Sequence, residues 1–195
     1  MRRVDGLFAD VYRVAIFTGM RRSEICGLKW DMVDLDANEI RVTRTLQRII
    51  GKGLVEGQPK TARSRRSISL SPVTVGILQR VRTQLLERKF AYGPAWTDTC
   101  YVFTELNGLP IEADRLSKDF ASVIRRLELP HLSLHGLRHA HATLMLTQGV
   151  HLKVVSERLG HSNIAVTADT YSHVLPGLQR DVALALDELL TGTGS

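Results

Sequence analysis

Residues 131–173 read HLSLHGLRHAHATLMLTQGVHLKVVSERLGHSNIAVTADTYSH, and the fold expected for the whole chain follows from this stretch. His135 and Arg138 stand three positions apart, so both side chains project from one face of a helix. The tripeptide Leu-Gly-His161 follows at an expected helix end, and Tyr171 comes ten residues later. One segment therefore brings two imidazoles, a guanidinium and a phenol onto short helices.

Local signals divide this stretch into three helices. Ser133 is a favourable N-cap for a helix over residues 134–148, which a glycine ends. A second helix is expected over residues 153–159, and a Gly-His pair follows it. Ser162 can cap a third helix over residues 163–173, which places the tyrosine on its last turn.

A second group of chemically suggestive residues lies near the N-terminal end. The pair Thr18-Gly19 interrupts an apolar helical pattern over residues 6–18, and a helix is expected to resume over residues 22–28. Arg21 stands at this break, where a basic side chain can point into a cleft, although a solvated arginine fits the local pattern equally well. Glu24 follows three positions later, which is close enough to orient the guanidinium.

Residues 39–70 predict a small antiparallel sheet that is rich in positive charge. Strand signals occur over residues 39–50, from Val55 onward and over residues 65–70, with a Gly-Lys-Gly turn after the first strand. A run this basic is usually a solvated face, but contact with phosphates is its natural use. The cations of the run are Arg41, Arg44, Arg48, Lys52, Lys60, Arg63, Arg65 and Arg66.

Two longer helices are expected between the sheet and the decisive stretch. Ser71-Pro72 is a helix start, and the helix runs to about Phe90 with an apolar stripe that includes Leu85 and Leu86. A second helix is expected over residues 112–128. The intervening residues are expected to form loops with a short extended segment.

Composition bounds the class of protein. The chain has 195 residues, of which 44% are apolar and 24% charged, as expected for a globular domain with at most a small appendage. A net charge of +6 favours an anionic partner, with nucleic acid the default candidate, although a merely basic protein fits net charge alone. No metal-type cysteine spacing, signal peptide or membrane span is visible, which predicts a cytoplasmic protein that does not enter membranes.

In their order and spacing, the box around Arg21, the His135-x-x-Arg138 pair, Leu-Gly-His161 and Tyr171 resemble the tyrosine recombinase (phage integrase) family. The resemblance covers the chain from about Thr18 to about Pro176. It implies an α+β, mainly α fold, that of a DNA breaking-rejoining catalytic domain with a small three-stranded antiparallel sheet.

The resemblance also implies a division of the chain. Residues 1–178 are expected to form the catalytic domain. Residues 179–195 are expected to be a C-terminal helix or tail and a candidate for exchange between protomers. The N-terminal core-binding domain of the family is expected to be absent, because this chain begins only about seventeen residues before the first arginine box.

The resemblance assigns roles to individual residues. Lys60, in Pro59-Lys-Thr61, is chosen from the family pattern, because other cations lie near it. The residues expected to be catalytic are Arg21, Lys60, His135, Arg138, His161 and Tyr171, with Glu24 as the supporting acid. The residues expected to bind DNA are Arg41, Arg44, Arg63, Arg65 and Arg66.

The implied function is site-specific DNA recombination, of the integration or excision type, through a 3′-phosphotyrosyl DNA intermediate and without metal or other cofactor. The implied partners are double-stranded DNA with an attachment-type site, other protomers in a synaptic tetramer, and accessory DNA-bending or directionality proteins. A bacterial or phage-encoded protein that acts in the cytoplasm at the nucleoid is expected.

Three alternatives remain open at the level of sequence. A type IB topoisomerase shares the cleavage chemistry without choosing a site. A DNA-binding module could keep the basic face without the chemistry. A metal hydrolase could use His135, His139 and His161, although no HExxH pattern supports it.

Overall fold

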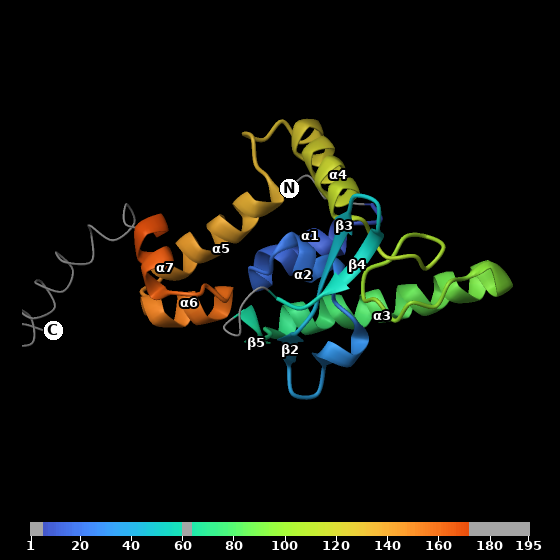
Figure 1. Ribbon diagram of the computed structural model, residues 1–195, viewed down its shortest axis with the longest axis horizontal. Coiled ribbons are helices and arrows are strands. Elements are labelled where there is room, and N and C mark those ends of the chain that lie inside the picture. Colours follow the sequence, from blue (N-terminus) through green and yellow to red (C-terminus); the bar gives the residue numbers. More distant parts are fainter. Residues whose placement is uncertain (1–5, 60–63, 172–195) are drawn as a thin grey trace, which may run out of the picture.

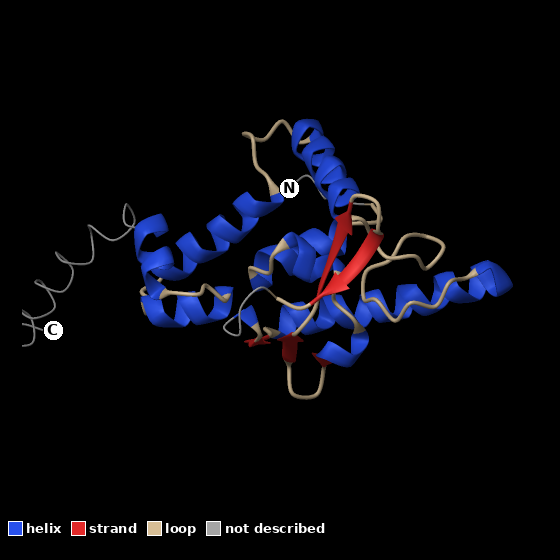
Figure 2. Cartoon of the chain, viewed as in Figure 1, coloured by secondary structure: helices blue, strands red, loops and turns tan. Residues whose placement is uncertain are grey.

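The structure is a computed structural model that describes residues 6–59 and 64–171, and it confirms a mainly helical α+β fold (Figures 1 and 2). The helices are α1 (Ala9–Thr18), α2 (Arg22–Cys26), α3 (Pro72–Tyr92), α4 (Ala113–Arg126), α5 (Leu134–Thr147), α6 (Leu152–Leu159) and α7 (Ile164–Tyr171), with short 3-10 turns at Trp30–Met32 and Gly93–Ala95. The strands are β1 (Val33–Asp34), β2 (Glu39–Val42), β3 (Thr45–Ile49), β4 (Gly53–Gly57) and β5 (Arg66–Ser69).

The strands form two separate antiparallel sheets. One is three-stranded in the order β1-β2-β5, with Ile40 opposite Ile68, and the other is the β3-β4 hairpin. The single strand expected over residues 39–50 is therefore divided between the two. The cause is a break in alternation: β2 buries every second residue, whereas Thr45 and Leu46 are buried consecutively at the start of β3.

The main core is built around α1, which contacts both α3 and α5 (Figure 1). Val14 of α1, Ile68 of β5, Leu78 of α3 and Leu116 of α4 are almost fully buried in it. A smaller apolar cluster joins α5 to α6, and its buried residues include Leu146 and Leu159. Since α6 packs on α5 and α5 packs on α1, the C-terminal part of the fold is held against the N-terminal helix.

Helix α3 extends beyond the core. Val75, Leu78 and Val81 form the buried stripe, but Leu86 is 60% exposed and Phe90 is 91% exposed. The apolar stripe expected to continue through Leu86 was therefore wrong in its last turns, because the helix runs past the body of the molecule there (Figure 2).

Side-chain acceptors mark the N-terminal ends of α5 and α7. Ser133 accepts a hydrogen bond from the backbone N–H of Gly136, as its position predicts. At α7 the side chain of Asn163 accepts from the backbone N–H of Ala165. Within the two described ranges, none of the helices is both long enough and apolar enough to cross a membrane.

Candidate functional site

Two glycine turns, distant in sequence, meet at the centre of the site. Gly19 ends α1 with φ 65° and Gly160 ends α6 with φ 67°, a left-handed conformation that glycine adopts without steric cost. A Cβ atom on Gly19 would lie 2.7 Å from the His141 ring and 2.9 Å from the Leu159 side chain. The first arginine box therefore packs directly against the Leu-Gly-His segment.

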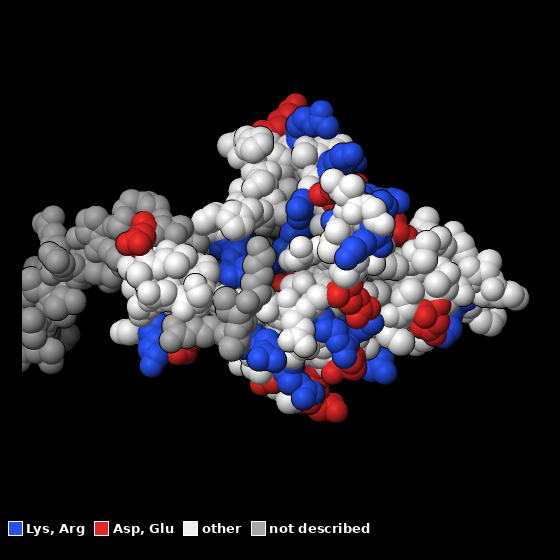
Figure 3. All heavy atoms as spheres, in the orientation of Figure 1, with Lys and Arg blue, Asp and Glu red and all other residues white. Residues whose placement is uncertain are grey.

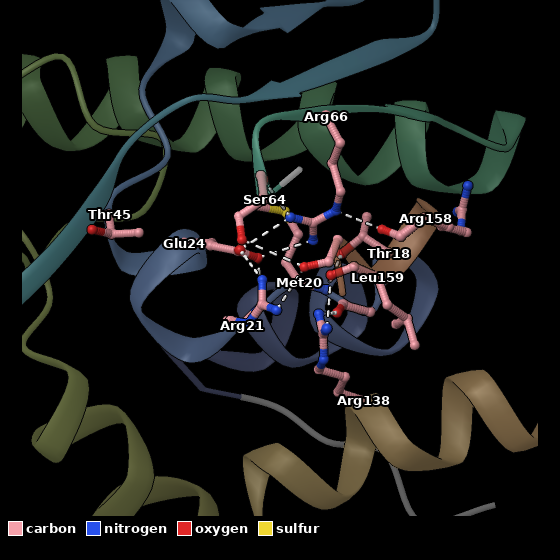
Figure 4. Close-up of polar contacts among 12 residues, drawn as sticks. Thr18, Met20, Arg21, Glu24, Thr45, Ser64, Arg66, Arg138, Arg158 and Leu159 are labelled. Carbon is pink, nitrogen blue, oxygen red and sulfur yellow. Dashed lines mark hydrogen bonds and ion pairs between the residues drawn. The ribbon is translucent and has the colours of Figure 1, made fainter. Parts of the chain in front are cut away.

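Arg138 ties both turns to helix α5. Its side chain is buried, with Nη1 donating to the carbonyl oxygen of Gly19 at 2.7 Å and Nη2 donating to that of Leu159 at 2.7 Å (Figure 4). Hydrogen bonds between a charged donor and a buried carbonyl are among the stronger ones in proteins. Arg138 is thus fixed in place by the two turns that it connects.

Arg21 reaches the same turn from the other side. Its Nη2 donates to the carbonyl oxygen of Gly160 at 2.9 Å, its Nη1 to Glu24 Oε1 at 2.8 Å, and its backbone N–H to Glu24 Oε2 at 2.8 Å. Arg21 and Arg138 therefore hold the successive carbonyl groups of residues 160 and 159. The two guanidinium groups expected at one site do lie at one turn.

Glu24 is the buried acid of the site. It is 1% exposed and accepts from both Arg21 and Arg66. Burial alone would raise the pKa of its carboxyl group, but the hydrogen bonds and positive charge of Arg66 and Arg21 hold that pKa below its usual value. Glu24 is therefore an ionised carboxylate that orients Arg21.

The two histidines of the expected site are neutral near pH 7. Burial, followed by the charges of Arg138, Arg21 and Arg66, lowers the pKa of His161 to about 4. Its Nδ1 lies 2.8 Å from the hydroxyl of Thr167 on α7. Burial and the neighbouring ring of His139 lower the pKa of His135 as well.

Four of the expected site residues, Arg21, Glu24, His135 and Arg138, line one groove of about 800 Å3, and His161 is not among the residues that line it. Arg21, His135 and Arg138 form part of its wall, together with the turn at Gly160 and residues of the β3-β4 hairpin such as Gln47. Lys and Arg side chains are visible in the hollow between the part that carries α5 and the part that carries the hairpin (Figure 3). The groove is open and partly lined by cations, which suits a polyanion rather than a small apolar ligand.

Several expected site residues fall outside what the structure describes. Lys60 and Arg63 lie between its two ranges, and the tail beyond residue 171 lies after the second range. Tyr171 is the last residue of α7, and the position of its side chain is not part of the description.

The cations expected to bind DNA differ in what they contact. Arg41 and Arg65 are exposed, whereas Arg44 is paired with Asp31 at 2.8 Å. Arg66 was expected among the surface cations, and that expectation was wrong, because its side chain is only 6% exposed and is bound to Glu24. Alternation along β5 could have indicated this, since Arg66 stands two positions before the buried Ile68 and therefore on the same face.

Other contacts of the site have no local signal in the sequence. Arg158 donates to Nε2 of His141 and to the carbonyl oxygens of Phe17 and Ser69. The carbonyl oxygen of Ile16 lies 2.9 Å from Nδ1 of His141, so Nδ1 carries the proton of that ring and Nε2 accepts. Burial and the charge of Arg158 lower the pKa of His141 to about 4.

The centroids of the His135 and His139 rings lie 4.5 Å apart, and the two rings are in a T-shaped arrangement. Across residues 6–59 and 64–171, no three side chains of His, Cys, Asp or Glu come together as a group that could hold a metal ion.

Comparisons with known proteins agree with this geometry. A model described as "Phage integrase family" matches residues 9–177. The tyrosine recombinase XerC-like protein of Caldanaerobacter subterraneus is 34% identical over 190 residues, which cover 92% of this chain and 49% of that protein. The ICEBs1 integrase of Bacillus subtilis is 31% identical over 184 residues, which cover 94% and 50%. The chain thus spans about half the length of these curated relatives.

Solved structures show the same fold. The Tn1549 transposon integrase, in complex with transposon right end DNA, matches with a TM-score of 0.79 at 26% identity, covering 97% of this chain and 61% of that chain. The XerA recombinase matches with a TM-score of 0.69 at 23% identity, covering 93% and 57%.

Proposed function

This chain belongs to the phage integrase family, that of the tyrosine recombinases, and from this premise we propose that it is the catalytic part of a site-specific DNA recombinase. The observation that carries the proposal is the pair of guanidinium groups, Arg21 and Arg138, held on successive carbonyl groups in one open groove. Planar, permanently charged guanidinium groups match the non-bridging oxygens of a phosphodiester.

The reaction begins with attack of the Tyr171 phenol oxygen on a backbone phosphorus. The new O–P bond forms a 3′-phosphotyrosyl link as the bond to the 5′ oxygen breaks, and Lys60 gives that oxygen a proton. Attack by another 5′-hydroxyl reverses these steps. Each step exchanges one phosphate ester for another, so rejoining needs no outside source of energy.

Arg21 and Arg138 stabilise the charge that develops on the non-bridging oxygens during both steps. His161 is neutral at pH 7 and can take part as a hydrogen-bond donor rather than as a cation. In the tautomer in which Thr167 donates to Nδ1, the other ring nitrogen carries the proton and can bond a phosphate oxygen. His135, also with a lowered pKa, can bond the phosphate or receive the tyrosine proton.

The natural substrate is double-stranded DNA with an attachment-type site, and several protomers act together in a synapse, with accessory DNA-bending or directionality proteins as further partners. The groove, which is partly lined by arginine side chains, supports contact with the DNA backbone. The DNA in the Tn1549 integrase structure, a relative with a similar fold, supports the same assignment.

The test uses the full-length protein and a duplex that carries the site it selects from a randomised pool. A nick a few nucleotides from the scissile phosphate makes the fragment that carries the new 5′-hydroxyl short. This fragment diffuses away and cannot be rejoined, so the covalent adduct accumulates. The wild-type protein should form the adduct, in EDTA as well, and Tyr171→Phe should bind the duplex equally but form none. An adduct with Tyr171→Phe would place the nucleophile elsewhere. Site-independent cleavage would favour a topoisomerase, and binding without adduct would favour a DNA-binding module.

A further inference from the structure

Arg66 contacts both Glu24, which binds Arg21, and the end of α6, although it lies on β5. It stands on β5, and its Nε donates to the carbonyl oxygen of Arg158 at 2.6 Å, in the last turn of α6. Its Nη1 donates to the carbonyl oxygen of Ser64 at 3.1 Å and to Glu24 Oε1 at 3.0 Å, and its Nη2 donates to Glu24 Oε2 at 3.0 Å (Figure 4). These bonds occupy a buried guanidinium group, so it does not serve as a surface contact for DNA.

Glu24 is shared evenly between Arg66 and Arg21. Each carboxylate oxygen accepts one N–H from Arg66, and each accepts one from Arg21, through Nη1 at Oε1 and through the backbone N–H at Oε2. Arg66 is the more deeply buried of the two partners, with 6% of its side chain exposed against 35% for Arg21. The carboxylate that directs Arg21 is therefore itself held in place by Arg66.

Arg66 also supports the turn that carries His161. A Cβ atom on Gly160 would lie 2.9 Å from both Cδ and Nη1 of Arg66, so the turn rests against this side chain with no room for a methyl group. The same turn presents the carbonyl groups bound by Arg21 and Arg138. A shift of Arg66 would move these carbonyl groups and the histidine that follows them.

We propose that Arg66 is a positioning residue of the recombination reaction, an inference that rests on the proposed function. Its hydrogen bonds go to Glu24, Ser64 and Arg158, so its proposed effect on the reaction passes through other groups. Through Glu24 it sets the direction of Arg21, which precedes α2. Through the Gly160 turn it sets the place of His161, which follows α6, so that both groups meet the same phosphate.

Arg66→Lys should fail in this role although it keeps the charge. One ammonium group on a flexible stem cannot span two carboxylate oxygens and the Arg158 carbonyl in the way that a planar fork does. Misplacement of a catalytic group by about 1 Å can slow a reaction about 10²-fold. We therefore expect Arg66→Lys to form the covalent adduct about 10²-fold more slowly, with DNA affinity nearly unchanged.

The matched control is Arg80→Lys. Arg80 also binds one carboxylate through two N–H groups, because its Nε and Nη2 both donate to Asp10. It lies on α3, outside the groove. Both variants are made in the full-length protein and compared with wild type for thermal unfolding, DNA affinity and single-turnover cleavage of the nicked duplex. The Arg80→Lys variant should cleave at the wild-type rate.

A second substrate separates positioning from general damage. A methylphosphonate at the scissile position removes the negative charge that Arg21 neutralises. If Arg66 acts through Arg21, the defect of Arg66→Lys should shrink from about 10²-fold to less than about 10-fold on this substrate, whereas a loosely folded variant should be slow on both. Should Arg66→Lys not fold, Arg66→Gln tests the same contacts, since one amide group cannot replace the hydrogen bonds to both Glu24 oxygens, and the same substrate dependence is expected.

The two ideas fail in different ways. If wild type forms no adduct, the proposed function is overturned and the role of Arg66 with it. If wild type cleaves but folded Arg66→Lys cleaves equally fast, or is slowed equally on both substrates, Arg66 is not a positioning residue and the recombinase assignment stands.

Discussion

Replacing Glu24 by glutamine tests whether the buried carboxylate holds the site together. Each oxygen of Glu24 accepts two N–H groups, at distances of 2.8 and 3.0 Å. A glutamine keeps one acceptor oxygen and turns an NH2 group toward the other two donors, so two hydrogen bonds to charged groups are lost. Such bonds contribute about 1.5–3 kcal/mol each.

The sum is about 3–6 kcal/mol, and the lower end is the better figure because Arg21 is partly exposed and screened by solvent. Loss of one partner from a buried ion pair costs a similar amount, about 3–5 kcal/mol. For a chain of this size, about 3 kcal/mol corresponds to a fall of roughly 6–12 °C in the midpoint of thermal unfolding.

The assay is urea denaturation of wild type, Glu24→Gln and the control Glu112→Gln. Glu112 also receives two N–H groups from one arginine, Arg48, but both side chains are exposed. The control should therefore lose much less stability than Glu24→Gln, because solvent screens the exposed pair. Equal losses in the two variants would refute the idea that burial makes Glu24 a structural centre.

Three further predictions concern single groups. Lys60→Ala should cleave ordinary DNA about 10²–10⁴-fold more slowly and recover on a strand with sulfur at the bridging 5′ position, since a thiolate leaves without a proton; no recovery would exclude Lys60 as the general acid. Arg138→Ala should lose about 3 kcal/mol of transition-state stabilisation, measured as cleavage rate, with a smaller loss of DNA affinity; equal losses would make Arg138 a docking residue only. The pKa of His141 is about 4 in the folded chain and about 6.5 in the unfolded chain, so the unfolded chain binds the proton first and the free energy of unfolding falls as the pH drops from 6.5 to 4. Urea titrations at pH 7 and pH 4.5 should therefore show a smaller loss of stability for His141→Gln than for wild type. Equal losses would contradict the lowered pKa of His141.

The parts of the fold that were predictable are those with local signals. Caps at Ser71 and Ser133 and glycines after helices are short-range features, and the helices begin and end near them. The division of residues 39–50 between two sheets depends instead on packing: a Cβ atom on Gly27 would lie 2.8 Å from the backbone of Thr45 and Leu46, so the end of α2 sits directly on the start of β3.

The sequence motifs named candidate site residues but not the contacts among them. Motif spacing indicated Arg21 and Arg138, but it does not reveal that both hold one turn from positions more than a hundred residues apart. The contact between His141 and Ile16 spans 125 positions and has no local pattern. Burial of Arg66 was partly readable from strand alternation, whereas its pairing with Glu24 required the tertiary structure.

The bonds of the two site arginines to the 159–160 turn explain why charge alone is not an adequate description of them. A guanidinium group has five N–H donors in a plane, so Arg21 can keep its bonds to Gly160 and Glu24 and still offer N–H groups to a phosphate. Arg21 can therefore bind the protein and a ligand at the same time, through different N–H groups. In the proposed reaction, a DNA phosphate bound by Arg21 would therefore act on the backbone at the end of α6, which leads into α7 and its last residue, Tyr171. The proposed binding of the substrate and the placement of α7 are thus coupled through one turn.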